Sequence, residues 1–371
     1  KTFDVPAQLD TNCSDPPSVF SVTYDLSGYV FDMTGTGGTV FNAVNTDVTT
    51  QISPNSTGNV DIFPCDSFYV GNNLSGLIPQ YVKGYFGQPV LPLSDTTNFA
   101  LFNHVIGGTL GLEDVDINLT LKNGIGADAR AIIGNIISIN TRTGTSIALS
   151  NPVIGSAINI NRAVDNSGEV ALSEYIVALN PGNSNIKNMI ENIPDKIGYS
   201  LDLEINPLGN ISGGNDFMYY KPGFKASLDM TLPLSLVAND LTLSDTIDIS
   251  IQNSNAQHVN YGTLTLYADN GFPFDAAVQV FMLNANGNVI DELIGAVNTI
   301  DEAPIDASLR VISKRLTKII IPVSSEKINQ LFQSTKKLNI IAKFNTSAQP
   351  AYIKIYSTYS IDFQLTGDFN Y

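Results

Sequence analysis

Alternation of apolar and polar residues with a period of two dominates the chain. It is clearest over residues 116–122, 199–205, 242–251, 263–267 and 352–356. Because side chains of a strand point alternately to opposite faces, these stretches predict β-strands with one dry face and one wet face. Turn sequences such as Asn123-Gly124 and Asn286-Gly287 separate them at intervals of about ten residues. The pattern predicts an all-β protein of antiparallel sandwiches or barrels.

Helical periodicity is confined to two short stretches. Residues 185–193 place Ile186, Met189, Ile190 and Ile193 on one stripe, and Pro194 follows. The second stretch, residues 324–333, begins with Ser324 as an N-cap and carries Ile328, Leu331 and Phe332 on its apolar side. We expect one short helix at each place.

An internal repeat is the most informative feature, because a duplicated unit constrains the whole architecture. The turn residues Asn123, Gly124 and Asp128 recur as Asn270, Gly271 and Asp275, with one constant offset along the chain. A strand precedes each copy, and a single short helix follows it. The sequence therefore predicts two similar β lobes, residues 94–206 and 224–371, joined by a linker at 207–223. Residues 1–93 fall outside the repeat and predict a separate N-terminal β module.

The two cysteines of the chain, Cys13 and Cys65, both belong to this N-terminal module. Each lies in a turn-like context, and a disulfide between them would stabilise the fold by about 4 kcal/mol in the chain-entropy model. Two unpaired structural thiols are the alternative. The first residues, Lys1-Thr-Phe-Asp-Val-Pro, do not form a basic and apolar signal region, so we expect either a cytosolic protein or an exported one whose signal peptide has been removed, and the cysteines favour export.

Composition narrows the possible functions. Only 15% of the residues are charged, and 19 Lys and Arg stand against 35 Asp and Glu, which gives a net charge of −16. A nucleic-acid partner is not expected, because phosphate binding needs clustered Lys and Arg. No apolar stretch reaches the 18 residues that a membrane-spanning helix requires.

No group of residues indicates catalysis. The two histidines, His104 and His258, lie far from any Gly-x-Ser-x-Gly turn, and the alternating carboxylates read as solvated strand faces. The loop that starts at Asp165 has suitable calcium ligands but lacks the EF-hand spacing. We therefore predict neither enzyme activity, nor a cofactor, nor a metal site.

Residues 205–345 resemble exported two-domain β proteins of the Bacteroidota. The likeness lies in the run that begins Phe217-Met-Tyr-Tyr-Lys-Pro-Gly, in the strand 241–246 and in the turn 270–275. Within that group, the plug subunits of the type 9 secretion translocon are similar. The resemblance implies a periplasmic or outer-membrane-associated protein. It also implies possible O-glycosylation of Thr96 and Thr246, each preceded by Asp, although chance explains these two sites equally well.

Three functions without catalysis follow. The first is an envelope protein that binds and occludes or caps an outer-membrane translocation barrel, to which it is peripheral. The second is a surface module that binds a glycan or a protein through exposed aromatic residues such as Tyr219 and Tyr220. The third is a carrier that holds an apolar ligand between two sheets, closed by the amphipathic helix.

Overall fold

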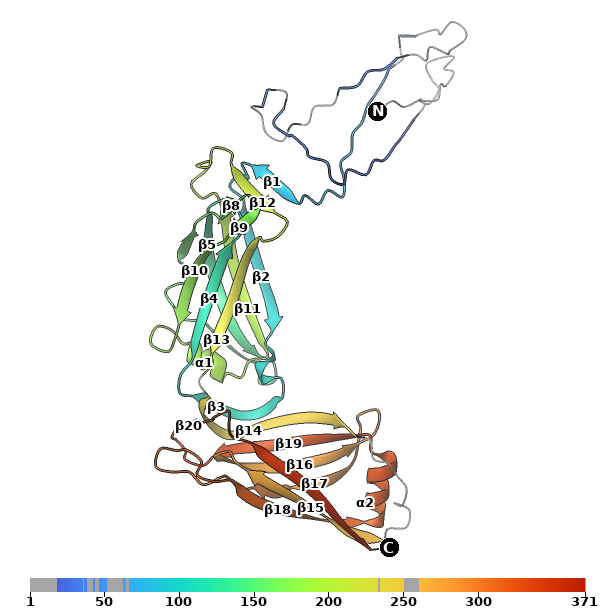
Figure 1. Cartoon of the computed structure of the whole chain (residues 1–371), viewed down its shortest axis with the longest axis vertical. Helices are drawn as coiled ribbons and strands as arrows, with labels where there is room; N and C mark the ends of the chain where they lie inside the picture. The colour runs from blue at the N-terminus through green and yellow to red at the C-terminus, as the bar shows by residue number, and fades with distance from the viewer. Residues whose placement is uncertain are drawn as a thin grey trace.

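The computed structural model describes residues 19–35, 37–38, 43, 47–51, 63–64, 67–232, 234–249 and 260–370. Every named strand pairs antiparallel with its neighbour, and the helices are short (Figure 1). The all-β fold class predicted from the period-two alternation is confirmed.

The first lobe consists of two facing sheets. One has the order β10 (Ser173–Leu179), β4 (Asp116–Asn123), β13 (Phe224–Thr231). The other has the order β2 (Val90–Asn98), β11 (Lys196–Ile205), β5 (Ala129–Asn140), β6 (Thr145–Ala148), and β7 (Ala157–Ile160) also pairs with β5.

The second lobe uses the same order of equivalent strands. Its smaller sheet is β18 (Arg315–Ser324), β15 (Tyr261–Asn270), β21 (Ile361–Asn370). Its larger sheet is β17 (Val289–Ile300), β16 (Phe274–Leu283), β19 (Lys337–Thr346), β14 (Ser235–Asp248), β20 (Ile353–Lys354). In each lobe the central strand of the smaller sheet leads through the repeated turn into the larger sheet, so the repeat in the sequence corresponds to a repeat in topology.

Helices form at the two places where the periodicity predicts them. They are α1 (Ile186–Glu191) and α2 (Ser325–Asn329), the latter continued by a π-helical turn, η3 (Gln330–Ser334). The Ser324 hydroxyl accepts a hydrogen bond from the Lys327 amide, as expected of an N-cap. The remaining short elements are η1 (Ala100–Phe102), β8 (Val164–Asn166) and β9 (Glu169–Ala171).

The lobe boundaries differ from the predicted ones. Strand β13 lies in the predicted second lobe, yet it pairs along its full length with β4 of the first. Strand β12 (Asp216–Tyr219) lies in the predicted linker and pairs with β1 (Tyr81–Gly84), which the sequence assigned to the N-terminal module together with the first residues of β2. The chain therefore returns to the first lobe after residue 207. Local alternation cannot reveal such a return, because it specifies a strand but not its partner.

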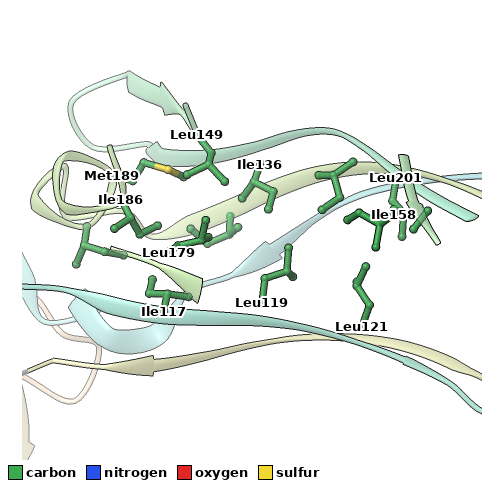
Figure 2. Packing of buried hydrophobic residues seen from close by; sticks show 14 of the residues in the cluster. Ile117, Leu119, Leu121, Ile136, Leu149, Ile158, Leu179, Ile186, Met189 and Leu201 are labelled. Atoms are coloured by element: carbon green, nitrogen blue, oxygen red, sulfur yellow. The ribbon is translucent and has the colours of Figure 1, made fainter. Parts of the chain in front are cut away.

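Apolar side chains from both sheets fill the first lobe (Figure 2). Leu119 and Leu121 from β4 lie opposite Ile136 and Leu201 of the larger sheet. At one end, Ile186 and Met189 of α1 approach Leu149, and the helix closes the core there. A second buried cluster fills the other lobe, with Met282 and Ile328 fully buried.

Strand β3 (Val105–Leu112) joins the two lobes. It comes from the first lobe in sequence, but it pairs with β14 at the edge of the larger sheet of the second lobe. Lys187 of α1 adds a hydrogen bond from its Nζ to the Tyr352 hydroxyl at 3.1 Å, and this bond raises the pKa of Lys187. The lobes are thus connected by a shared sheet and by a side-chain contact.

We expect Gly108→Ala to destabilise this junction by about 2 kcal/mol, because it forces a left-handed backbone on a residue with a side chain. Gly108 has φ +84°, and an added Cβ would lie 2.1 Å from the Asp240 carbonyl oxygen. Gly107→Ala is the matched control, since its Cβ would meet the Thr242 side chain at 3.9 Å. Thermal unfolding of both variants checks the expectation, and equal midpoints would contradict it.

Candidate binding surfaces

The repeated turn of the first lobe is organised by one buried side chain. The Nδ2 atom of Asn123 donates to the carbonyl oxygens of Ala127 and Asn161, both at 2.9 Å. Its Oδ1 atom accepts from the Ile125 amide at 2.9 Å. Because Asn123 is fully buried, these bonds satisfy backbone groups that water cannot reach.

The turn of the second lobe repeats this arrangement. Asn270 Nδ2 donates to the carbonyl oxygens of Phe274 and Asp301 at 3.0 and 2.9 Å, and Oδ1 accepts from the Phe272 amide at 2.9 Å. The glycine after each asparagine touches a backbone carbonyl that a Cβ would strike at 2.7 Å, namely Gly223 in the first lobe and Ser360 in the second. These residues therefore hold the fold and offer no group to a ligand.

The aspartates of the two turns have different surroundings. Asp128 accepts a hydrogen bond from the Arg162 amide at 3.0 Å. Burial raises the pKa of the Asp275 carboxyl, and the carboxylates of Glu302 and Asp301 act in the same direction. This is a local difference within a shared turn, and no nucleophile accompanies either carboxyl.

A buried carboxylate missed by the sequence analysis lies near these residues in the first lobe. Asp216 is fully buried, and its Oδ2 atom accepts from the Phe86 amide at 3.0 Å and from Asn206 Nδ2 at 2.7 Å. The Arg162 guanidinium lies 3.9 Å from Oδ1 and donates to the Asn215 carbonyl at 2.8 Å. The group ties four distant chain segments together. Only tertiary contacts identify it, since Asp216 lies in a Gly- and Asn-rich stretch that reads as a linker.

The two Asp-Thr sequences occupy equivalent positions in the two lobes. Thr96 pairs with Gly198 and Thr246 with Asn339, at matching points of β11 and β19. In both, the preceding aspartate accepts the threonine amide, at 2.7 Å for Thr96 and 2.8 Å for Thr246. Both threonines are exposed, and their O-glycosylation stays a prediction.

These aspartates cap backbone amides that point away from the sheet. Hydrogen bonds alternate along an antiparallel pair, and the bond from Ile205 N to Pro89 O directs odd-numbered residues of β2 toward β11. The Thr96 amide therefore faces the free edge. The bond from Ile249 N to Lys336 O shows that odd-numbered residues of β14 bond to β19, so the Thr246 amide also points away from its sheet partner β19. In each Asp-Thr pair, the aspartate thus occupies an outward amide that could otherwise pair with another chain.

The aromatic residues considered for glycan binding lie at the β1/β12 end of the first lobe. The Tyr219 hydroxyl donates to Asp165 Oδ2 at 2.9 Å, and its ring lies 4.7 Å from that of Tyr81. Tyr220 is exposed. Of the two tyrosines, Tyr219 is held by its neighbours and Tyr220 remains available to a ligand.

The histidines show no catalytic arrangement in the described part of the chain. His104 is exposed, and its Nδ1 atom lies 3.7 Å from Asp245 and 3.4 Å from the Ser244 carbonyl. His258, Cys13 and Cys65 lie outside the described residues. Among those described, no three His, Cys, Asp or Glu side chains are placed to hold a metal ion.

Exposed apolar side chains concentrate in residues 19–33 and 67–78, outside both lobes. The first segment exposes Val22, Tyr29, Val30, Phe31 and Met33, and the second exposes Phe68, Tyr69, Val70, Leu74, Leu77 and Ile78. The best-formed pockets of the described surface are, in contrast, open depressions rather than enclosed cavities. One lies at residues 148–154 and another lies beside Lys327. No described helix has the length and apolarity needed to cross a membrane.

Comparison with solved structures gives partial similarities, two of which follow. No family model and no curated protein matches the chain. One of the two similar structures is the crystal structure of a protein, described as secreted, from Parabacteroides distasonis, a member of the Bacteroidota. It has 12% sequence identity and a TM-score of 0.36, and the match covers 80% of this chain and 85% of that one. A structure of infectious bursal disease virus, Gx strain, has 10% identity and a TM-score of 0.21, covering 76% and 72%.

We expect Asn270→Asp to lower stability by about 2–3 kcal/mol, because a carboxylate would face two buried carbonyl oxygens in place of a donor. Asn123→Asp should have a similar effect on the first lobe. Asn286→Asp is the control, since Asn286 also precedes a glycine but is exposed. Denaturant unfolding measures all three, and a loss no larger than that of the control would contradict the assigned role.

Proposed function

We propose that this chain is an exported, non-catalytic envelope protein that binds and caps an outer-membrane translocation barrel through protein contacts. The observation that carries the proposal is the distribution of exposed apolar side chains. They are concentrated in residues 67–78, beside β1, where the chain enters the first lobe. Contiguous exposed apolar surface of this kind is typical of protein interaction sites.

Two further observations support a contact function. The described residues bring together no nucleophile with a base and no set of metal ligands. The lobes have filled cores and form stable scaffolds, and segments held by such scaffolds are where recognition usually resides. An apolar-ligand carrier is less well supported, since the best-formed hollows are open dents rather than enclosed apolar cavities.

A glycan-binding role is the second candidate, and Tyr220 is the observation in its favour. Tyr220 follows Tyr219 in the sequence and its side chain is exposed, and aromatic faces are common platforms for sugar rings. Tyr220→Ala should then abolish binding to an oligosaccharide array while leaving capture of a membrane protein unchanged.

The main proposal is tested by affinity purification of the tagged full chain from detergent-solubilised envelopes of its own organism. A very large outer-membrane barrel is expected at a stoichiometric ratio. Tyr69→Asp combined with Ile78→Asp should reduce its recovery at least tenfold, because both substitutions place charge in the apolar contact. Ile312→Asp is the matched control, since Ile312 is 67% exposed and Ile78 is 69% exposed. Recovery of the chain alone would overturn the proposal.

A further inference from the structure

Several strands lie at the outer edges of the sheets of the two lobes, and three of them, β2, β14 and β18, are protected, whereas β13, the first-lobe counterpart of β21, contains no proline. Strand β2 contains Pro92, and the nitrogens of even-numbered residues such as Pro92 and Thr96 point away from β11, toward the free edge. Asp95 in addition accepts the outward amide of Thr96. Strand β14 is covered by β3 up to Leu243 and then carries the Asp245 cap. Strand β18 has Pro322 at its free edge, because the bond from Ser325 N to Asn260 O directs its odd-numbered residues toward β15.

Strand β21 has no such protection. It is the outermost strand of its sheet and pairs only with β15 among the described residues. The bond from Gly271 N to Ser360 O directs its even-numbered residues toward β15, so the amides of Phe363 and Leu365 point outward. No proline and no side-chain cap interrupts its ten residues.

The apolar side chains of β21 are incompletely covered. Ile361 and Phe369 pack on the second core, and residues of the same parity point to the same face. Phe363 and Leu365 share that face, yet they are 57% and 58% exposed. Ile247 of β14, which pairs with Leu338 on the core side, is also exposed. Exposed apolar side chains thus remain on both β21 and β14 among the described residues.

The chain also contains a segment of strand-like composition, residues 19–33, that belongs to none of the named strands of the described residues. Residues 20–27 alternate apolar and polar positions, and after a turn at Gly28 the chain continues with the apolar run Tyr29–Phe31; Gly28 has φ +79°, and Tyr29 N donates to Leu26 O at 3.1 Å. The structure assigns no strand to these residues, and Tyr29, Phe31 and Met33 are exposed. The pattern predicts a hairpin that needs a sheet to join.

We infer that residues 19–33 of one copy pair with the β21 edge of a second copy and cover Phe363 and Leu365. The segment lies outside the two lobes, beyond the end of the first lobe at which β1 lies, and β21 lies in the lobe at the other end (Figure 1). Pairing between copies is therefore head-to-tail, and each added copy presents a new free edge. Contacts of this kind build open chains rather than closed dimers.

This inference does not rest on the proposed function, since capture of a barrel was assigned to residues 67–78. It is tested by light scattering of the full chain during size-exclusion chromatography at increasing concentration. We expect the average mass to rise at least twofold above that of the monomer. A mass that stays at the monomer value up to about 100 μM would overturn the inference, because most specific contacts have dissociation constants below that concentration.

Two variants separate the donor from the acceptor. The donor variant, Tyr29→Asp with Phe31→Asp, places charge among the apolar side chains of residues 19–33. The acceptor variant, Leu365→Pro, removes an outward amide of β21 without removing a hydrogen bond to β15. Leu365→Lys is a second acceptor variant in case the proline disturbs β21. Each should be monomeric alone, whereas a mixture of donor and acceptor variants should form dimers that grow no further. Ile320→Lys is the control, because Ile320 is 59% exposed in the same sheet but away from this edge.

Hydrogen exchange gives an independent readout. The amides of Phe363 and Leu365 should become at least tenfold more protected as the wild-type concentration rises, and the Tyr29/Phe31 variant should abolish that change. Protection that is independent of concentration would place the segment on the β21 edge of its own chain and overturn the head-to-tail pairing.

Discussion

The unpaired backbone of outer strands is the constraint on which this structure depends. A β-sandwich leaves the amides and carbonyls of its edge strands open to other chains. Here Pro92 and Pro322 remove outward donors from β2 and β18, and Asp95 and Asp245 occupy outward amides of β2 and β14. The chain thus solves the problem with local residue choices, without closing its sheets into barrels. The outermost strands β13 and β21 contain no such proline.

The turn between the central strands is the second element common to both lobes. In each lobe the chain crosses from one sheet to the other through a turn whose asparagine is buried, and the crossing leaves carbonyl groups without strand partners. Asn123 and Asn270 satisfy the same three backbone groups of their own lobes with one carboxamide each. A shorter or charged side chain lacks this combination of two donors and an acceptor. The identity of the residue therefore follows from the topology.

Much of this could be predicted from the sequence, and the failures have a common cause. Alternation located the strands, the Asn-Gly pairs located the turns, and apolar periodicity located α1 and α2, because each signal is local. The boundary near residue 224 was wrong because strand pairing is a long-range property, and neither β13 nor β12 encodes its partner. Asp216 was missed for the same reason, since its partners Phe86 and Asn206 come from other segments.

The two lobes share a topology but differ in what their edges can do, and strand β3 accounts for much of the difference. By extending the larger sheet of the second lobe, β3 covers the first half of the β14 edge and fixes the lobes to each other. The equivalent edge of the first lobe receives no such strand, and Pro92 protects it instead. The two lobes are therefore similar bodies, and the placement of one strand makes them unequal. Two lobes with identical edges would offer any partner two equivalent sites and no defined orientation, and this inequality removes that equivalence.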